Sequence, residues 1–156
     1  MSASQADLRL RPPHIKEAYA LAGLHAACFE TPWSADTFVE LIQSPGVISV
    51  AAARGEQLLG VLVARVAADE AELITVAVAP QAQRAGIGRA LVQTACSLAA
   101  AAGAQRMFLE VAVENLAAAA LYRALSFQAV GLRRGYYERP GGRAMDAAVL
   151  RRDLTA

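Results

Sequence analysis

Residues 76–89, VAVAPQAQRAGIGR, join a short β-branched run to a glycine loop that opens directly into a helix. Gly86 and Gly88 allow the backbone to turn sharply and to approach a ligand closely. The first N–H groups of the helix have no helical partner, and the positive end of the helix dipole lies behind them. Arg84 and Arg89 add positive charge. The stretch therefore predicts an anion site, with a plain strand-to-helix turn as the alternative.

The loop lacks the features of the common nucleotide-binding loops. No Gly-Lys-Ser/Thr ends it, so it is not a P-loop. Leu91 follows where a dinucleotide fingerprint would have its third glycine, and the loop comes late in the chain rather than after the first strand. The loop alone does not identify the anion.

The residues on both sides of the loop predict one α/β domain over residues 1–156, with a mixed sheet. Alternating apolar residues predict strands at 7–11, 47–53, 58–66, 73–78, 106–113, 127–132 and 147–154. The last two are expected to form a hairpin around Pro140-Gly141-Gly142. Helical spacing predicts helices at 14–28, from Ser34 to about 42, from the glycine loop to about 102, and from Asn115 to about 125. In the first helix the inward stripe is expected at Ile15, Ala18, Tyr19, Ala22 and Ala26, and in the third at Ile87, Leu91, Ala95 and Leu98.

Composition excludes several classes of protein. The net charge of +1 does not favour a general nucleic-acid binder, and the absence of an apolar run of about 18 residues predicts no membrane span. The start of the chain does not resemble a signal peptide, so Cys28 and Cys96 are expected to be reduced thiols in a cytoplasmic protein. His14 and His25 are isolated and are interpreted as surface or satisfied helix residues, so no metal is expected. A monomer or weak oligomer is expected.

Glu110 is unusual because it lies in the middle of the apolar strand MFLEVAV. A buried carboxylate is costly unless it has a partner or a use. Burial raises the pKa of a glutamate from about 4.3 towards neutrality, where it can act as a general base. A salt-bridged structural glutamate is the alternative interpretation.

Asn115 and Tyr122 follow on the next predicted helix and share one face of it. Asn115 is expected to cap that helix, and a cap alone would explain it. Tyr122 is either a core aromatic or a proton donor, since a phenol with a pKa of about 10 stays protonated at pH 7. Together with Glu110 and the glycine loop, these residues are far more specific than any one of them.

The strand ITVAV, the loop QRAGIGRAL, LEVAVEN and ALYRALSF resemble the GCN-five-related N-acetyltransferase (GNAT) superfamily. Its Gln/Arg-x-x-Gly-x-Gly/Ala motif is matched by Gln83, Gly86 and Gly88. PWSADTF, DEAEL, LEV…N…ALY and RRGYY further resemble the bacterial RimI-type N-alpha-acetyltransferases, which act on the N-terminal alanine of a small-subunit ribosomal protein. The resemblance implies a mixed, mostly antiparallel sheet of about seven strands, with helices on both faces and a splay at the central strands.

The resemblance also implies acetyl-CoA as cosubstrate and a protein N-terminus as acceptor, with Glu110 as base and Tyr122 as acid. It implies that the pyrophosphate binds at the loop, the pantetheine arm beside the preceding strand, and the acceptor in an aromatic groove with an acidic turn near it. The implied donor contacts are Val76, Ala77, Val78, Arg84, Ala85, Gly86, Ile87, Gly88, Arg89 and Asn115, and the implied acceptor contacts are Trp33, Glu70, Tyr136 and Tyr137.

Two positions depart from the family pattern. Gly135 stands where an asparagine commonly precedes the tyrosine pair, which puts the choice of acceptor in doubt. Ser126 stands where a glycine is usual, and a left-handed conformation there would cost roughly 1 kcal/mol. Arg133 and Arg134 are interpreted as a solvated strand end. Acetylation of lysine side chains or of a small amine, and a CoA-binding module without catalysis, remain alternative functions.

Overall fold

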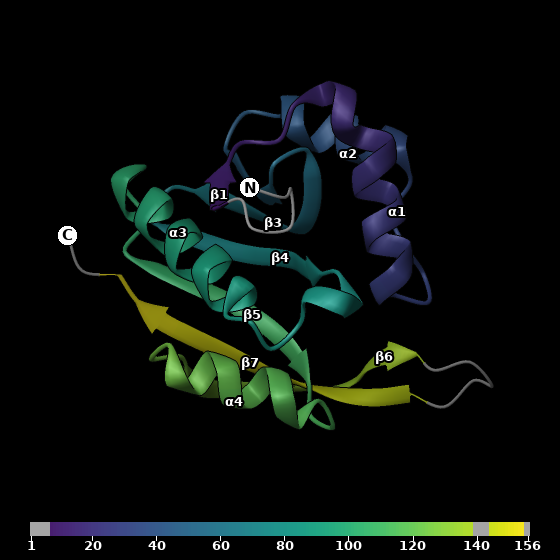
Figure 1. Ribbon diagram of the computed structural model, residues 1–156. Helices are drawn as coiled ribbons and strands as arrows, with labels where there is room; N and C mark the ends of the chain where they lie inside the picture. The colour runs from purple at the N-terminus through teal and green to yellow at the C-terminus, as the bar shows by residue number, and fades with distance from the viewer. Residues whose placement is uncertain (1–6, 139–143, 155–156) are drawn as a thin grey trace.

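The computed structural model describes residues 7–138 and 144–154, in which seven strands and four α-helices alternate with two short 3-10 turns (Figure 1). The strands are β1 (Leu8–Arg11), β2 (Val47–Arg54), β3 (Gln57–Ala67), β4 (Glu70–Val78), β5 (Arg106–Ala112), β6 (Gln128–Glu138) and β7 (Ala144–Asp153). The helices are η2 (Ile15–Glu17), α1 (Ala18–Cys28), α2 (Ala35–Gln43), η3 (Pro80–Ala82), α3 (Ile87–Ala101) and α4 (Leu116–Ala124).

All seven strands belong to one sheet with the order β1-β2-β3-β4-β5-β7-β6. Neighbouring strands run antiparallel except for β4 and β5, which are parallel because α3 connects them across one face of the sheet. The mixed, mostly antiparallel sheet expected from the resemblance is therefore confirmed.

The single parallel pair is also where the sheet opens. β4 and β5 pair only through Glu70 with Arg106, Ala71 with Met107 and Glu72 with Phe108. Beyond these pairs β4 continues beside β3 and β5 continues beside β7, so the two strands diverge (Figure 1). The expected splay is present, and it leaves the far half of β4 with an open edge.

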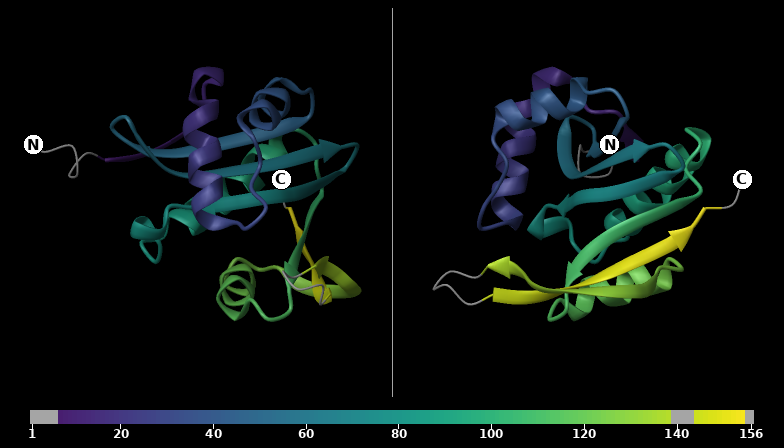
Figure 2. Two further views of the ribbon diagram at one scale, coloured as in Figure 1. Left: turned by 90° about the vertical axis from the view of Figure 1, so that its right-hand side faces the viewer. Right: turned by 180° about the vertical axis from the view of Figure 1, so that it is seen from behind.

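Helices cover both faces of the sheet (Figure 2). One core lies under α3 and α4 and includes Leu62, Leu91 and Met107, which are fully buried. The other lies under α1 and α2 and includes Leu21 and Phe38, also fully buried. β4 therefore lies between two apolar layers, whereas β5 contributes Met107, Leu109 and Val111 to the first core.

The expected stripe of α1 is only partly correct: Ala18 is buried and Ala22 packs against the core, but Tyr19 and Ala26 are exposed. The helix begins at Ala18, after η2, and it buries Ala18, Leu21, Leu24 and His25, whereas Tyr19 is 87% exposed. Alanines occur all around this helix, so its apolar periodicity is weak, and the large leucines decide which side faces the sheet. In α3 the same ambiguity misplaced Leu98, which is 45% exposed while Ala99 is buried.

Several boundaries differ from the expectations. β4 begins at Glu70, inside the segment expected to be an acidic turn, and β6 extends to Glu138. The hairpin of β6 with β7 is confirmed, but Pro140-Gly141-Gly142 lies outside the described residues. No helix in residues 7–138 or 144–154 combines the length and apolarity that crossing a membrane requires.

Candidate active site

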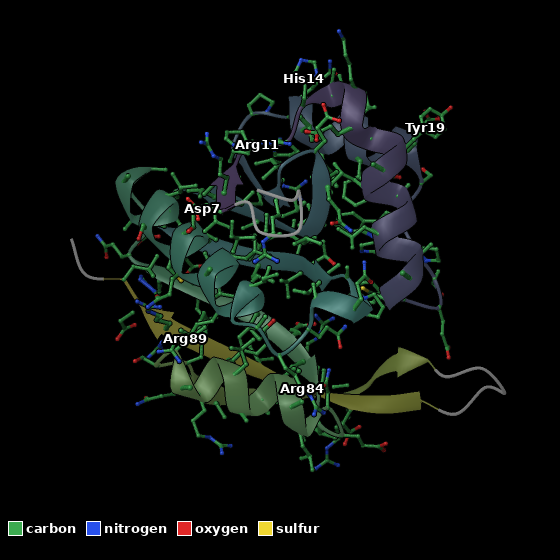
Figure 3. The ribbon with its side chains drawn as sticks, in the orientation of Figure 1. Asp7, Arg11, His14, Tyr19, Arg84 and Arg89 are labelled. Atoms are coloured by element: carbon green, nitrogen blue, oxygen red, sulfur yellow. The ribbon has the colours of Figure 1, made fainter. Side chains whose placement is uncertain are left out.

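The glycine loop ends in an exposed helix N-terminus. Gly86, with φ +83°, is the N-cap of α3, and Arg84 is also left-handed with φ +65°. The N–H of Ala90 donates to the carbonyl of Gly86, so the N–H groups of the first three residues of α3 precede the helical bonds. The first turn carries no acidic side chain, and Arg84 and Arg89 are both exposed (Figure 3). The site therefore has the donors and charge that an anion needs.

Gly88 has no structural requirement for glycine in this fold. Its φ lies outside the left-handed range, and an added Cβ would meet Leu121 Cδ2 at 3.6 Å and Val78 Cγ2 at 3.8 Å, which are ordinary contacts. An alanine, which the Gly-x-Gly/Ala motif also admits, would therefore fit at this position.

The open edge of β4 presents backbone groups towards the fork. The N–H of Ala79 donates to the carbonyl of Leu59 in β3 at 2.8 Å. Consecutive residues of a strand present their backbone groups to opposite edges, so Val76 and Val78 face the fork and Ala77 faces β3. Of the three residues implied as contacts for the pantetheine arm, two have the required orientation.

The carbonyl of Val78 already has partners. It accepts hydrogen bonds from Cys28 Sγ at 3.2 Å and from Gln83 Nε2 at 3.1 Å. Burial raises the pKa of the Cys28 thiol, which therefore remains a donor at neutral pH. These bonds tie the end of α1 and the glycine loop to the same point of β4.

A cavity of about 330 Å³, here called the fork cavity, lies where β4 and β5 diverge. It brings together Glu110, Asn115 and Tyr122, which are expected to act together, and adds residues of β4 and of the segment after α1. The lining consists of Phe29, Leu73, Ile74, Thr75, Val76, Glu110, Val111, Ala112, Asn115, Ala118 and Tyr122.

α4 presents Asn115 and Tyr122 to this cavity. Asn115 is the N-cap, and its Oδ1 accepts from the N–H of Ala118 at 3.1 Å, as expected. Tyr122 is 5% exposed, and its ring packs edge-on against Phe127 with centroids 5.7 Å apart. Tyr122 is thus a core aromatic that also lines the cavity.

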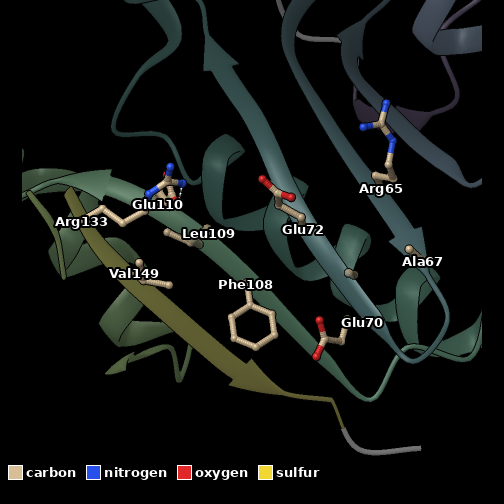
Figure 4. Close-up of a pocket in the computed structure, with 10 residues that line it drawn as sticks. Arg65, Ala67, Glu70, Glu72, Phe108, Leu109, Glu110, Arg133 and Val149 are labelled. Carbon is tan, nitrogen blue, oxygen red and sulfur yellow. Dashed lines mark hydrogen bonds and ion pairs between the residues drawn. The ribbon is translucent and has the colours of Figure 1, made fainter. Parts of the chain in front are cut away.

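A second cavity of about 400 Å³, here called the face cavity, lies on the sheet surface near the start of the fork (Figure 4). Carboxylates from β4 and β5 and arginines from β3 and β6 meet there. It is lined by Arg65, Ala67, Glu70, Ala71, Glu72, Phe108, Leu109, Glu110, Arg133 and Val149. Glu110 lines both cavities and therefore lies at the boundary between them.

Glu110 is less buried than its apolar neighbours suggested. Its side chain is 21% exposed because β5 alternates, burying Met107, Leu109 and Val111 on the other face. Its Oε1 accepts a hydrogen bond from Arg133 Nη1 at 2.5 Å (Figure 4). Glu110 therefore forms the ion pair that the structural interpretation requires. Its position between two cavities also supports a role in the reaction. Arg133 is more than a solvated strand end.

The other predicted acceptor contacts are placed unevenly. Glu70 lines the face cavity and lies 3.9 Å from Arg106 Nε, while the neighbouring Asp69 lies 3.2 Å from Arg106 Nη2. Trp33 is partly buried, packs against the core under α1 and α2, and does not line the fork cavity or the face cavity. Tyr136 and Tyr137 lie in β6, and their side chains are outside the described part of the structure.

Among the lining residues that the sequence did not assign to the site are Phe29, Arg65, Thr75, Phe108 and Arg133. Thr75 interrupts the apolar run ITVAV, which is the kind of signal that singled out Glu110. The contact of Arg133 with Glu110 depends on the register of β6 and β7, and the pairing shifts between Arg133 and Tyr137. Such a shift cannot be predicted from the local sequence pattern.

Comparisons with known proteins identify the family of the chain and agree with its fold. Residues 18–127 match the Acetyltransferase (GNAT) family. The chain is 37% identical over 143 residues to N-alpha-acetyltransferase RimI of Mycobacterium tuberculosis, covering 88% of this chain and 87% of that protein. It is 34% identical over 119 residues to the ribosomal protein bS18-alanine N-acetyltransferase of Escherichia coli (strain K12), covering 76% and 79%. The crystal structure of the Escherichia coli ribosomal-protein-S18-alanine N-acetyltransferase superposes with a TM-score of 0.87 at 28% identity, covering 96% of each chain. The chain belongs to the acetyltransferase (GNAT) family.

Proposed function

We propose that this protein transfers an acetyl group from acetyl-CoA to the N-terminal α-amine of a protein, with the reaction at the fork between β4 and β5. The observation that carries the proposal is the position of Glu110, which lines both the fork cavity and the face cavity. One space can hold a thioester and the other an amine, with a carboxylate between them.

The donor binds along α3 and β4. Its pyrophosphate accepts hydrogen bonds from the N–H groups at the start of α3, where Arg84 and Arg89 supply positive charge. Its pantetheine arm runs beside the open edge of β4 as an added strand would. Val76 and the N–H of Val78 are the pairing groups, because the carbonyl of Val78 already accepts from Cys28 and Gln83.

The reaction is a direct attack of the amine on the thioester carbonyl. The C–N bond forms, the C–S bond breaks, the amine proton passes to Glu110 directly or through a water, and Tyr122 gives its phenolic proton to the leaving thiolate. An α-amine with a pKa of about 7.7–8.0 is partly unprotonated at neutral pH, so a carboxylate is a sufficient base. Arg133 orients the carboxylate of Glu110 at the boundary of the two cavities.

The acceptor enters through the face cavity, where Glu70, Glu72 and Glu110 favour a cationic N-terminus. The relatives from Mycobacterium tuberculosis and Escherichia coli are named as an N-alpha-acetyltransferase and as a ribosomal protein bS18-alanine N-acetyltransferase. Their similarity over most of this chain supports the N-terminal alanine of a small-subunit ribosomal protein as the acceptor.

Two experiments test the acceptor. Purified protein is given acetyl-CoA with peptides that begin with alanine or serine, with peptides whose only amine is a lysine side chain, and with polyamines. Mass spectrometry of protein N-termini from cells with and without the gene then identifies the natural acceptor. Acetylation of an alanine-starting peptide is expected, and acetylation of lysine or polyamines alone would contradict the proposal.

The roles of two residues are tested separately. We expect Glu110→Gln and Tyr122→Phe each to reduce kcat by about 100-fold or more, because each removes a proton-transfer group. Binding of acetyl-CoA, followed by calorimetry, should stay close to that of the wild type. Near-normal turnover in both variants would contradict the assignment of Glu110 as base and Tyr122 as acid. It would not bear on the choice of acceptor.

A further inference from the structure

His25 is enclosed at the end of α1 although its side chain is polar. It is 3% exposed, and burial lowers its pKa, so the imidazole is neutral near pH 7. Three aromatic rings surround it: the centroids of Phe29, Trp33 and Phe38 lie 4.4, 5.0 and 5.6 Å from that of the imidazole. Phe29 and Trp33 belong to the segment between α1 and α2, so one imidazole contacts both ends of that loop.

Two hydrogen bonds define which nitrogen carries the proton. The backbone N–H of Trp33 donates to His25 Nδ1 at 2.9 Å, so Nδ1 is an acceptor. A neutral imidazole has one donor nitrogen, which must then be Nε2. Nε2 lies 3.0 Å from Thr75 Oγ1 and donates to it. The ring therefore links the backbone of the α1–α2 loop to a side chain of β4.

The link lies beside the proposed reaction centre. Thr75 lines the fork cavity, next to Val76 of the open edge, and Phe29 lines the same cavity. Glu72, which lines the face cavity, lies three positions earlier on the same strand. A shift of the loop away from Thr75 would therefore change the wall of the space in which amine and thioester meet.

We propose that His25, through Thr75 and the N–H of Trp33, is a positioning residue that holds the α1–α2 loop against β4, so that Phe29 shapes the part of the fork cavity where the amine reaches the thioester. This inference rests on the proposed acetyl transfer. The proposed pyrophosphate contacts lie elsewhere, at the start of α3, whereas Thr75 adjoins Val76 in the fork cavity, so the link acts at the reaction centre and not on the nucleotide end of the donor. The packing of α1 itself depends on Leu21 and Leu24, which do not take part in the link.

The test uses Thr75→Val, which keeps the shape of the side chain but removes the hydroxyl, and Thr75→Ser as its matched control, which keeps the hydroxyl. His25→Asn is the third variant, since its amide oxygen can accept from Trp33 but its side chain is too short for Thr75. We expect Thr75→Val and His25→Asn to lower kcat/KM for an alanine-starting peptide by about fivefold or more, the loss expected for one buried hydrogen bond. KM for acetyl-CoA should change less than kcat/KM for the peptide, because the link does not touch the proposed pyrophosphate site at the start of α3.

The double variant gives a sharper measure. If both residues act through one link, His25→Asn combined with Thr75→Val lowers kcat/KM no further than either change alone. Independent effects that multiply would overturn the proposal. So would a loss in Thr75→Ser as large as that in Thr75→Val, or an unchanged kcat/KM in all variants.

A second measurement does not depend on activity. Trp33 is the only tryptophan of the chain, and its ring stacks on His25. In Thr75→Val its fluorescence should shift to the red and become more accessible to acrylamide, and in Thr75→Ser it should match the wild type. If the wild type acetylates none of the peptides, the proposed function fails, and the fluorescence alone decides whether the link exists. Unchanged fluorescence in Thr75→Val would overturn the link.

Discussion

Ser126 carries backbone strain at the end of the helix that presents Tyr122. Its φ is +72°, in the left-handed region. The N–H of Phe127 donates to the carbonyl of Tyr122 at 3.0 Å, and the N–H of Ser126 donates to that of Arg123 at 3.1 Å. These two bonds form a Schellman motif, and the edge-on contact of Phe127 with Tyr122 is its usual apolar contact. The motif thus packs Phe127 against the ring of Tyr122, and it requires Ser126 to adopt an unfavourable left-handed conformation.

We expect Ser126→Gly to stabilise the protein by about 0.5–1 kcal/mol. A non-glycine residue in the left-handed conformation costs about 1–2 kcal/mol, and glycine is free of this cost. The greater conformational entropy of glycine in the unfolded chain reduces this gain in stability by about 0.4–1 kcal/mol. In a chain of this length the net gain corresponds to a rise in Tm of roughly 1–4 °C.

Calorimetry or urea unfolding measures this difference, and two variants act as controls. Ser126→Ala keeps the strain and should not gain stability, which separates relief of strain from loss of the hydroxyl. Ala120→Gly, at an exposed position inside α4, should lose about 1 kcal/mol, because glycine weakens a helix interior. A lower Tm in Ser126→Gly, or an equal gain in Ser126→Ala, would refute the reasoning.

Three further expectations concern the donor site, the core and an ion pair. Gly88→Ala should leave both Tm and acetyl-CoA binding in calorimetry nearly unchanged, because an added Cβ meets Leu121 and Val78 only at ordinary contact distances and the family motif admits alanine there. Gly60→Ala should cost about 1–3 kcal/mol, because an added Cβ would lie 3.0–3.2 Å from atoms of α3 and β4, whereas Gly23→Ala, with nothing within 4 Å, should not destabilise. Glu17 accepts two 2.8 Å hydrogen bonds from Arg11, which lowers its pKa from 4.5 to about 2. Since the folded pKa is the lower one, its contribution to stability is present above about pH 4.5 and is lost as the pH falls towards 2, so the stability difference between wild type and Glu17→Gln should shrink over that range in urea unfolding.

The geometry of the glycine loop and of the helix starts could be predicted from sequence because it depends on local chemistry. A glycine with a positive φ, Gly86, precedes a helix start, and Asn115 caps the next helix, and both are short-range features. The resemblance also predicted the divergence of β4 and β5, which the pairing confirms. The left-handed Ser126 matches the cost anticipated for a position where glycine is usual, and the φ of +64° at Gly135 explains why asparagine and glycine, which both tolerate this conformation, can replace each other there.

Predictions that needed long-range information were less accurate. The side of α1 that faces the sheet could not be deduced from an alanine-rich pattern, so His25 was not expected in the core. The partner of Glu110 comes from β6, 23 residues away, through a register that shifts near Arg133. No short stretch of sequence predicts the pairing of Glu110 with Arg133, because strand register depends on the packing of whole strands and on the turns between them.

This difference bears on what the site can select. In the proposed function, donor binding depends on backbone groups: the N–H groups at the start of α3 and the edge of β4 suit any ligand with a pyrophosphate and an amide-bearing arm. The proposed acceptor side consists instead of side chains on separate elements, with Glu72 from β4 and Arg133 from β6. Backbone groups are the same in every sequence with this fold, whereas each side chain can change independently. Specificity for the acceptor should therefore reside in these few side chains, and substitutions there should change which amine is acetylated before they change the donor.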